Sequence, residues 1–340
     1  MPRLIVAPWV AAAALSVTAA CAGSGVPRTA PTIARAETGA GRVHDDAFFS
    51  DALAVRKHVV VYLPPSYDRD TSRRYPVVYY LHGFSGNEAD WVSKGSIDVV
   101  ADSLFAAGTP EMILVMPDGD DGWYTTWSRQ VAYRTCADTV HVEAPDRYCV
   151  EHERYDDYVA RDVVHFVDAR YRTQADLAHR GIAGLSMGGY GATILALRYP
   201  DVFVAAASHS GVVSPLYTGP HPFAGPTRYA ATLEELRPSI GGLWTRYQNF
   251  WGSDLLHWRD MDPAHVAEQL VRHGARVPAL FFDCGREDGL VDQNRAFDAE
   301  LTRLGIPHTY AEWPGAHTWR YWNTHVRESL AWMGMRVGRK

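Results

Sequence analysis

The sequence predicts an α/β domain with a mostly parallel central sheet and helices on both of its faces. From residue 59 onward, short β-rich runs alternate with longer helix-compatible stretches, the pattern of a sheet built from strand–helix units. Several of the β-rich runs are almost continuously apolar, as strands are when helices cover them on both sides. A Gly-x-Ser-x-Gly pentapeptide at 184–188 stands at one strand-to-helix junction.

The two kinds of element can be placed along the chain. Strands are expected at residues 58–64, 75–83, 111–119, 180–186, 202–211 and 278–285, with one more beginning at residue 308. Helices are expected at 97–107, 155–171, 188–198, 264–273, 294–304 and 319–335. Residues 214–260, rich in Pro, Gly, Trp and Tyr, interrupt the alternation. Long inserts in compact domains are often functional, so we interpret this one as a lid, the alternative being a surface excursion.

The N-terminal residues have the features of an export signal. Arg3 precedes an uncharged stretch, and Ala20-Cys21-Ala22 matches an A-x-A cleavage site, so residues 1–22 are predicted to be a signal peptide. An uncleaved anchor and a lipidated Cys21 that attaches the protein to a membrane are the alternatives. Residues 23–41 have almost no large apolar side chains and are predicted to be a flexible linker. The folded domain is expected at 42–340, in a secreted or cell-envelope protein.

Charge and cysteine content limit the possible partners of the protein and the compartment in which it folds. The formal net charge is −6 and no dense block of Lys or Arg occurs, which argues against a nucleic-acid partner. Cys136 and Cys149 flank a polar stretch, which favours a disulfide across a surface loop in an oxidising compartment. Cys284 ends an apolar run and is predicted to be a buried free thiol. Unpaired thiols throughout are the alternative.

The pentapeptide at 184–188 predicts a nucleophilic serine. Apolar residues run into it and a helix-compatible stretch runs out, so Ser186 is expected at a strained turn with its hydroxyl exposed. Gly184 and Gly188 would let the strand and the helix approach closely. A Gly-rich structural turn is the alternative interpretation.

A serine hydroxyl is a weak nucleophile, so it needs a base and a group that orients the base. In folds with this turn, the acid and then the base follow the serine along the chain, after later strands. His317 follows the last strand, whereas His308 begins it and would lie at the opposite edge. Glu287 and Asp288 both lie on the loop that leaves the strand at 278–285, and Asp283 is still within that strand.

An oxyanion hole is also required, because the tetrahedral intermediate develops negative charge on oxygen. One donor is expected to be the backbone N–H of Met187, which follows the nucleophile. The second is expected on the loop after the strand at 75–83, from Phe84 or, next in order, Gly83. His82 is interpreted as shaping this turn. Such a site needs no metal ion and no cofactor.

Aromatic residues gather on the predicted site loops. We predict that the aromatic residues Trp123, Tyr124, Trp127 and Trp319 bind an aryl or sugar-linked ester, although core packing is the more common fate of aromatic residues. The acidic turn at 118–122 has no bidentate Glu at the twelfth position of a calcium loop, where Arg129 lies, so it is interpreted as a turn.

Longer motifs resemble a known family. They are LHGFSGNEADW (81–91), MPDGDDGWYTTW (116–127), IAGLSMGGYGATILALRYPDVF (182–203), DCGREDGLVDQNRAFDAEL (283–301) and WPGAHTWRYW (313–322). They are similar to the putative-esterase branch of the α/β-hydrolases, which contains feruloyl and acetyl-xylan esterases, S-formylglutathione hydrolase and mycolyltransferases. The resemblance covers about residues 42–332. It implies Ser186 as nucleophile, Asp288 as acid, His317 as base, and Phe84 and Met187 as oxyanion donors.

We therefore expect a secreted serine esterase that acts on small-molecule or polysaccharide-linked carboxylic esters. The S-formylglutathione hydrolases are cytosolic, which the export signal contradicts. Mycolyltransferases lack the Gly-Gly-Tyr-Gly run that this chain has at 188–191. The closest alternative is an acyltransferase that passes the acyl group to a sugar or lipid alcohol. A non-catalytic cell-envelope binding protein is a further one.

Overall fold

The computed structural model describes residues 39–131, 149–218 and 228–338 of the chain. The predicted signal peptide with Cys21, most of the predicted linker, and Cys136 lie outside these residues. The domain boundaries and the pairing of Cys136 with Cys149 therefore stay predictions. Cys284 is a buried free cysteine, as predicted. None of the helices in the described ranges is long and apolar enough to cross a membrane.

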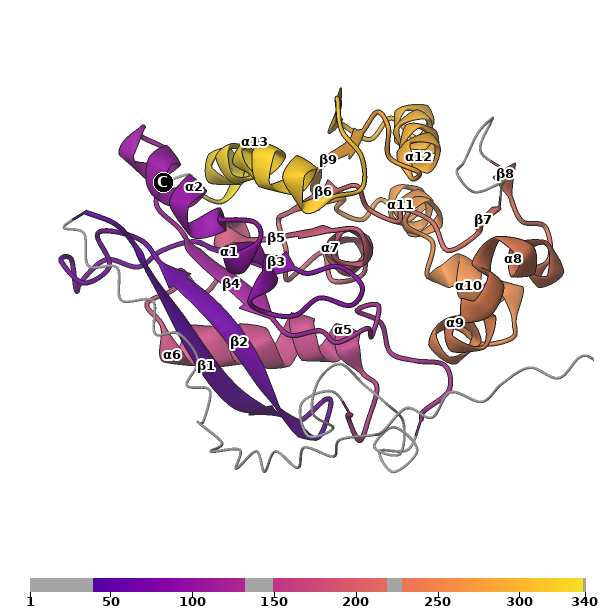
Figure 1. The fold of residues 1–340 in the computed structure, drawn as a ribbon, viewed down its shortest axis with the longest axis horizontal. Coiled ribbons are helices and arrows are strands. Elements are labelled where there is room, and N and C mark those ends of the chain that lie inside the picture. Colours follow the sequence, from indigo (N-terminus) through magenta and orange to yellow (C-terminus); the bar gives the residue numbers. More distant parts are fainter. Residues whose placement is uncertain (1–38, 132–148, 219–227, 339–340) are drawn as a thin grey trace, which may run out of the picture. The chain divides into compact units, whose positions relative to one another are not determined.

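An eight-stranded sheet forms the centre of the domain, in the order β1-β2-β4-β3-β5-β6-β9-β10 (Figure 1). The strands from β4 to β10 in this order pair in parallel, and β2 pairs antiparallel with both β1 and β4. This confirms the mostly parallel sheet. The strands are β1 (Arg42–Ser50), β2 (Val55–Leu63), β3 (Val77–Leu81), β4 (Ile113–Pro117), β5 (Arg180–Leu185), β6 (Ala205–His209), β9 (Ala279–Gly285) and β10 (His308–Trp313).

The edge strand β1 was not predicted from the sequence. Its side chains are mostly exposed or half-buried, so no strong apolar pattern marks it. It is held instead by antiparallel pairing with β2 along its whole length, from Arg42 opposite Leu63 to Ser50 opposite Val55. Backbone hydrogen bonds, which no side-chain pattern reveals, define this strand.

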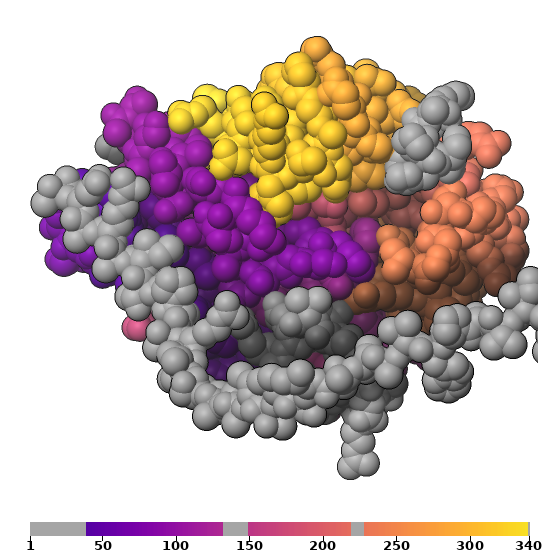
Figure 2. Space-filling view, in the orientation of Figure 1, coloured from indigo at the N-terminus to yellow at the C-terminus, as the bar shows by residue number. Residues whose placement is uncertain are grey.

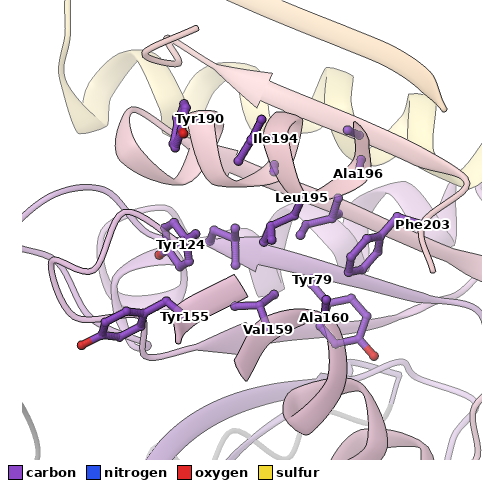
Figure 3. Packing of buried hydrophobic residues seen from close by; sticks show 14 of the residues in the cluster. Tyr79, Tyr124, Tyr155, Val159, Ala160, Tyr190, Ile194, Leu195, Ala196 and Phe203 are labelled. Atoms are coloured by element: carbon purple, nitrogen blue, oxygen red, sulfur yellow. The ribbon is translucent and has the colours of Figure 1, made fainter. Parts of the chain in front are cut away.

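Successive residues of the inner strands pack into two different cores. In β3, Val77, Tyr79 and Leu81 belong to one core, and Val78 and Tyr80 to the other, as the two-residue period of a strand requires. The first core includes α7 (Met187–Arg198) and the helical run of α5 (Tyr155–Asp157), a π-helical stretch (Tyr158–Val163) and α6 (Val164–Arg170) (Figure 3). The second includes α2 (Ile97–Ala106) and α13 (Trp319–Val337). Helices therefore cover both faces, as predicted.

The remaining helices lie around this frame. They are α1 (Asp90–Ser93), a 3-10 turn (Leu177–His179), α11 (Pro263–Arg272) and α12 (Val291–Arg303), together with the helices of the insert between β6 and β9. The insert helices are α8 (Leu233–Ile240), a 3-10 turn (Gly241–Leu243), α9 (Trp244–Trp251) and α10 (Leu255–Asp260). A short ladder of β7 (Tyr217–Thr218) and β8 (Arg228–Tyr229) precedes them. The insert is anchored by Trp251 and Trp258, whose side chains are completely buried.

Candidate active site

Ser186 lies at a sharp turn between β5 and α7, in a backbone conformation that L-residues rarely adopt. Its φ is 52° and its ψ is −118°. The glycines two residues to either side make this turn feasible. A Cβ on Gly184 would lie 2.2 Å from the carbonyl oxygen of Gly188, and a Cβ on Gly188 would lie 2.3 Å from that of Leu81. Only glycine fits at both positions, because the clashing atoms belong to the backbone.

His317 and Asp288 lie on the loops that follow two neighbouring strands, and two successive hydrogen bonds join them to Ser186. The ring nitrogen Nε2 of His317 lies 2.9 Å from Ser186 Oγ. Its Nδ1 lies 2.9 Å from Asp288 Oδ2. The other carboxylate oxygen of Asp288 accepts the backbone N–H of Leu290 at 2.9 Å. Because β9 and β10 are parallel neighbours, the loops that leave them reach the same edge of the sheet.

The structure places the two adjacent acids of this loop differently, and Asp288, the acid that the family resemblance implied, is the one that contacts His317. Asp288 is buried and faces His317, whereas Glu287 is exposed. The Glu287 carboxylate accepts the backbone N–H of Gly315, and the Glu287 N–H donates to the Gly315 carbonyl at 3.0 Å. Glu287 therefore holds the loop that carries His317, a contact that was not predicted.

The predicted oxyanion donors belong to two backbone segments that lie close to the nucleophile. Met187 is the first residue of α7, so its N–H has no acceptor within the helix. On the other side, a Cβ on Gly83 would lie 3.4 Å from the Cβ of Ser186, which brings the loop around residues 82–84 against the nucleophile. Phe84 is half-buried in this loop and packs against the first core. Phe84 and Met187 as oxyanion donors therefore stay a prediction.

Two of the four aromatic residues predicted to bind substrate are core residues instead. The exposed fraction is 3% for Trp123 and 0% for Tyr124. Trp123 packs edge-on against Trp251 of the insert, at 5.1 Å between ring centroids. The Tyr124 hydroxyl donates to the His82 carbonyl at 3.0 Å. The structure thus corrects this prediction: core packing, the alternative considered, takes both rings out of reach of a substrate.

The other two aromatic residues are half-buried. Trp127 packs against Phe250 of the insert, at 4.7 Å between ring centroids, and its Nε1–H donates to the Gly122 carbonyl at 3.0 Å. Trp319 packs edge-on against Trp322, and Trp322 in turn packs edge-on against the ring of His317 at 4.9 Å. Of the four, Trp319 is the one joined to His317 through a ring contact.

A buried polar network beneath the site was missed by the sequence analysis. His209 Nδ1 lies 2.6 Å from Asp283 Oδ2, and its Nε2 lies 2.7 Å from Ser329 Oγ. The Tyr321 hydroxyl donates to Asp283 Oδ1 at 2.8 Å. His209, Asp283 and Ser329 have no exposed surface, so this second Ser–His–Asp set is closed to substrate.

This network nonetheless supports the site, because the His209 carbonyl accepts the N–H of Ser186 at 3.0 Å. Tyr321 lies in the first turn of α13, shortly after His317. The signal in the sequence was the presence of His209 and Asp283 in apolar runs, since a buried polar side chain needs a partner. The partners could not be identified without the fold.

The fold and the strand–turn–helix junction at Ser186 place this protein among the enzymes with the α/β-hydrolase fold. The chain belongs to the Putative esterase family, whose model matches residues 50–333. This confirms the resemblance drawn from the motifs.

Named relatives support the same class. The chain is 29% identical over 287 residues to Esterase MT1326 of Mycobacterium tuberculosis (strain CDC 1551 / Oshkosh), a match that covers 80% of this chain and 55% of that protein. It thus spans about half the length of that curated relative. It is 24% identical over 298 residues to an Acetyl esterase of Caldicellulosiruptor saccharolyticus, covering 84% of this chain and 96% of that protein. The solved structure of a ferulic acid esterase matches with a TM-score of 0.62 at 26% identity, covering 88% and 99% of the two chains.

Proposed function

We propose that this protein is an exported serine esterase that hydrolyses carboxylic esters through an acyl-enzyme on Ser186. The observation that carries the proposal is the line of two hydrogen bonds, each 2.9 Å, that joins Ser186 Oγ to His317 and His317 to Asp288. Nucleophile, base and orienting acid in contact at such a turn are the requirements for activating a serine.

In the acylation step, Ser186 Oγ attacks the carbonyl carbon of the ester while His317 Nε2 takes the hydroxyl proton. The carbonyl oxygen becomes an oxyanion, which the N–H groups of Met187 and Phe84 would stabilise. When the tetrahedral intermediate collapses, the bond to the alcohol oxygen breaks, and His317 returns its proton to that oxygen. Asp288, bound to Nδ1, holds the imidazole in the tautomer that this transfer needs.

In the deacylation step, a water molecule takes the place of the alcohol beside the acyl group on Ser186. His317 takes a proton from the water as its oxygen attacks the acyl carbon, and then returns a proton to Ser186 Oγ as the acid leaves. Neither step needs a metal ion or a cofactor. Because an acyltransferase would use the same acyl-enzyme, the two reactions differ only in the acceptor.

The first test asks which molecule accepts the acyl group from Ser186. We expect p-nitrophenyl acetate and feruloyl esters to be converted mainly to free acid, even with millimolar trehalose, glycerol or xylo-oligosaccharide present. Two relatives are named for acetyl and ferulic acid esters, which supports short or aromatic acyl groups. Product ratios measured by chromatography, with the protein omitted as a control, would check this. Mainly transacylated sugar would favour the acyltransferase.

We propose export because residues 1–22 have the features of a signal peptide. The proposal predicts where the mature chain begins. We expect the full-length protein, expressed in a bacterial host with an export pathway, to leave the cytoplasm with this segment removed. Fractionation and intact mass spectrometry would measure both. A mature chain beginning at Gly23 or nearby would agree with simple cleavage, whereas a chain beginning at Cys21 with added acyl mass would show a lipoprotein. A cytoplasmic chain that retains residues 1–22 would contradict export.

A further inference from the structure

The insert reaches the oxyanion loop through one side chain of α9. The Arg246 guanidinium lies over the ring of Phe84, at 5.1 Å from the ring centroid. The same guanidinium donates to Asp121 Oδ2 at 3.1 Å. In the space-filling view, the insert helices lie directly beside the segment that contains residues 80–130 (Figure 2). Arg246 therefore joins the insert to the loop that carries the proposed oxyanion donor.

Asp121 connects this arginine to the backbone of the oxyanion loop. Its Oδ1 accepts the N–H of Ser85 at 2.6 Å, while its Oδ2 is bound by Arg246. Ser85 has a φ of 61°, a left-handed conformation that a non-glycine residue keeps only when its surroundings enforce it. The bond from Asp121 fixes the peptide plane between Phe84 and Ser85. It thereby restrains the residue whose N–H would bind the oxyanion.

The turn that carries Asp121 is itself firmly held. The Lys57 ammonium lies 2.6 Å from Asp118 and 2.7 Å from Asp120, and all three side chains are buried. Burial and the neighbouring Asp118 carboxylate raise the pKa of Asp120 to about 8, against the opposing charge of Lys57. The Gly119 N–H donates to His82 Nε2 at 2.9 Å. This turn therefore contacts both residue 82 and residue 85, on either side of Phe84.

The helix that carries Arg246 is equally fixed. Trp251, the last residue of α9, is completely buried. It packs edge-on against Trp123, which directly follows the acidic turn at 118–122, and against Tyr190 of α7. Ring contacts of this kind add to the stabilisation from burial. Since α7 begins at Met187, the insert is packed against the elements that carry both proposed oxyanion donors.

We propose that Asp121 is a positioning residue for the oxyanion donor Phe84, and that Arg246 makes the insert a fixed support of the oxyanion loop rather than a lid. The proposal rests on the proposed function of Ser186 and its oxyanion hole. Oxyanion donors act only when they are held close to where charge develops. Loosening the Phe84–Ser85 peptide is thus expected to weaken transition-state binding and leave ground-state binding nearly unchanged.

The test compares Asp121→Ala and Arg246→Gln with Arg237→Gln as the matched control. Arg237 lies on α8 of the same insert and pairs only loosely with Glu234, at 4.0 Å. Loss of one oxyanion donor typically costs about 10²- to 10³-fold in kcat. We expect Asp121→Ala to lower kcat for p-nitrophenyl acetate by about 10²-fold and Arg246→Gln by about 10-fold. KM should change less than twofold in both, and Arg237→Gln should match the wild type.

A second measurement separates positioning from a general loss of structure. Affinity for an aryl boronic acid, which forms a tetrahedral adduct with the serine, should fall by the same factor as kcat/KM. All rates are normalised to active sites titrated with a fluorophosphonate, so misfolded protein does not count. Unchanged kcat per active site, or a raised KM with kcat unchanged, would overturn the proposal.

Failure of this inference can be told apart from failure of the proposed function. If Ser186→Ala is inactive while Asp121→Ala and Arg246→Gln both keep the wild-type kcat, the positioning role is wrong and the serine mechanism stands. If Ser186→Ala stays active, the mechanism itself is wrong. Should Asp121→Ala fail to fold, Arg246→Gln alone decides, because the arginine is half-exposed and the Asp121 carboxylate still accepts the N–H of Ser85 in its absence.

Discussion

Ester hydrolysis is expected to fall by about 10⁵- to 10⁶-fold when Ser186 is replaced by alanine, because the acyl-enzyme can no longer form and only binding and the oxyanion donors remain. The change removes one oxygen from a half-buried position and leaves Gly184 and Gly188 in place, so the fold should persist. Turnover of p-nitrophenyl acetate and labelling by a fluorophosphonate probe would both be measured. Thermal unfolding of the variant serves as the control for folding.

Ser210 offers a matched serine. It also has a positive φ, 47°, and follows a neighbouring strand end, but it is completely buried. Ser210→Ala should therefore keep the fluorophosphonate label that Ser186→Ala loses. If the Ser186 variant retained more than a few per cent of activity after removal of contaminating esterases, the nucleophile would be another residue.

The second large effect is expected at Asp288. Replacement by asparagine keeps the shape of the side chain, but its amide lets the imidazole adopt the wrong tautomer. We expect kcat to fall by about 10³- to 10⁴-fold, by analogy with other Ser–His–Asp sites. The measurement is kcat per active site across several esters, because a loss of orientation should affect all of them equally.

Glu287 is the matched control for Asp288, one residue away on the same loop. Glu287→Gln keeps an oxygen that can accept the N–H of Gly315, so we expect only a small loss of activity. The opposite ranking would assign the orienting role to Glu287. Equal, moderate losses in both variants would mean that the loop supports His317 as a whole and that neither carboxylate is specific.

Local patterns in the sequence determined the inner strands and the helices that cover them, the turn at Ser186 and the position of His317. These features depend on short-range physics: the two-residue period of a strand, the 3.6-residue period of a helix, and glycines where backbones must touch. His317 could be chosen over His308 because His308 begins the strand β10 and His317 lies on the loop that leaves it. Such positions can be read from neighbours along the chain.

Position along the chain did not separate Asp288 from Glu287, and only the family resemblance implied Asp288. The tertiary structure shows that Asp288 contacts His317, because adjacent residues on a loop point in different directions and no local pattern records which one faces the base. It also showed that Trp123 and Tyr124 are core residues, since Trp123 packs against Trp251 of the insert and Tyr124 binds the His82 carbonyl. The link from Arg246 through Asp121 to Ser85 joins three segments distant in the sequence. Long-range contacts of this kind arise when the sheet and the insert assemble, so no local pattern could predict them.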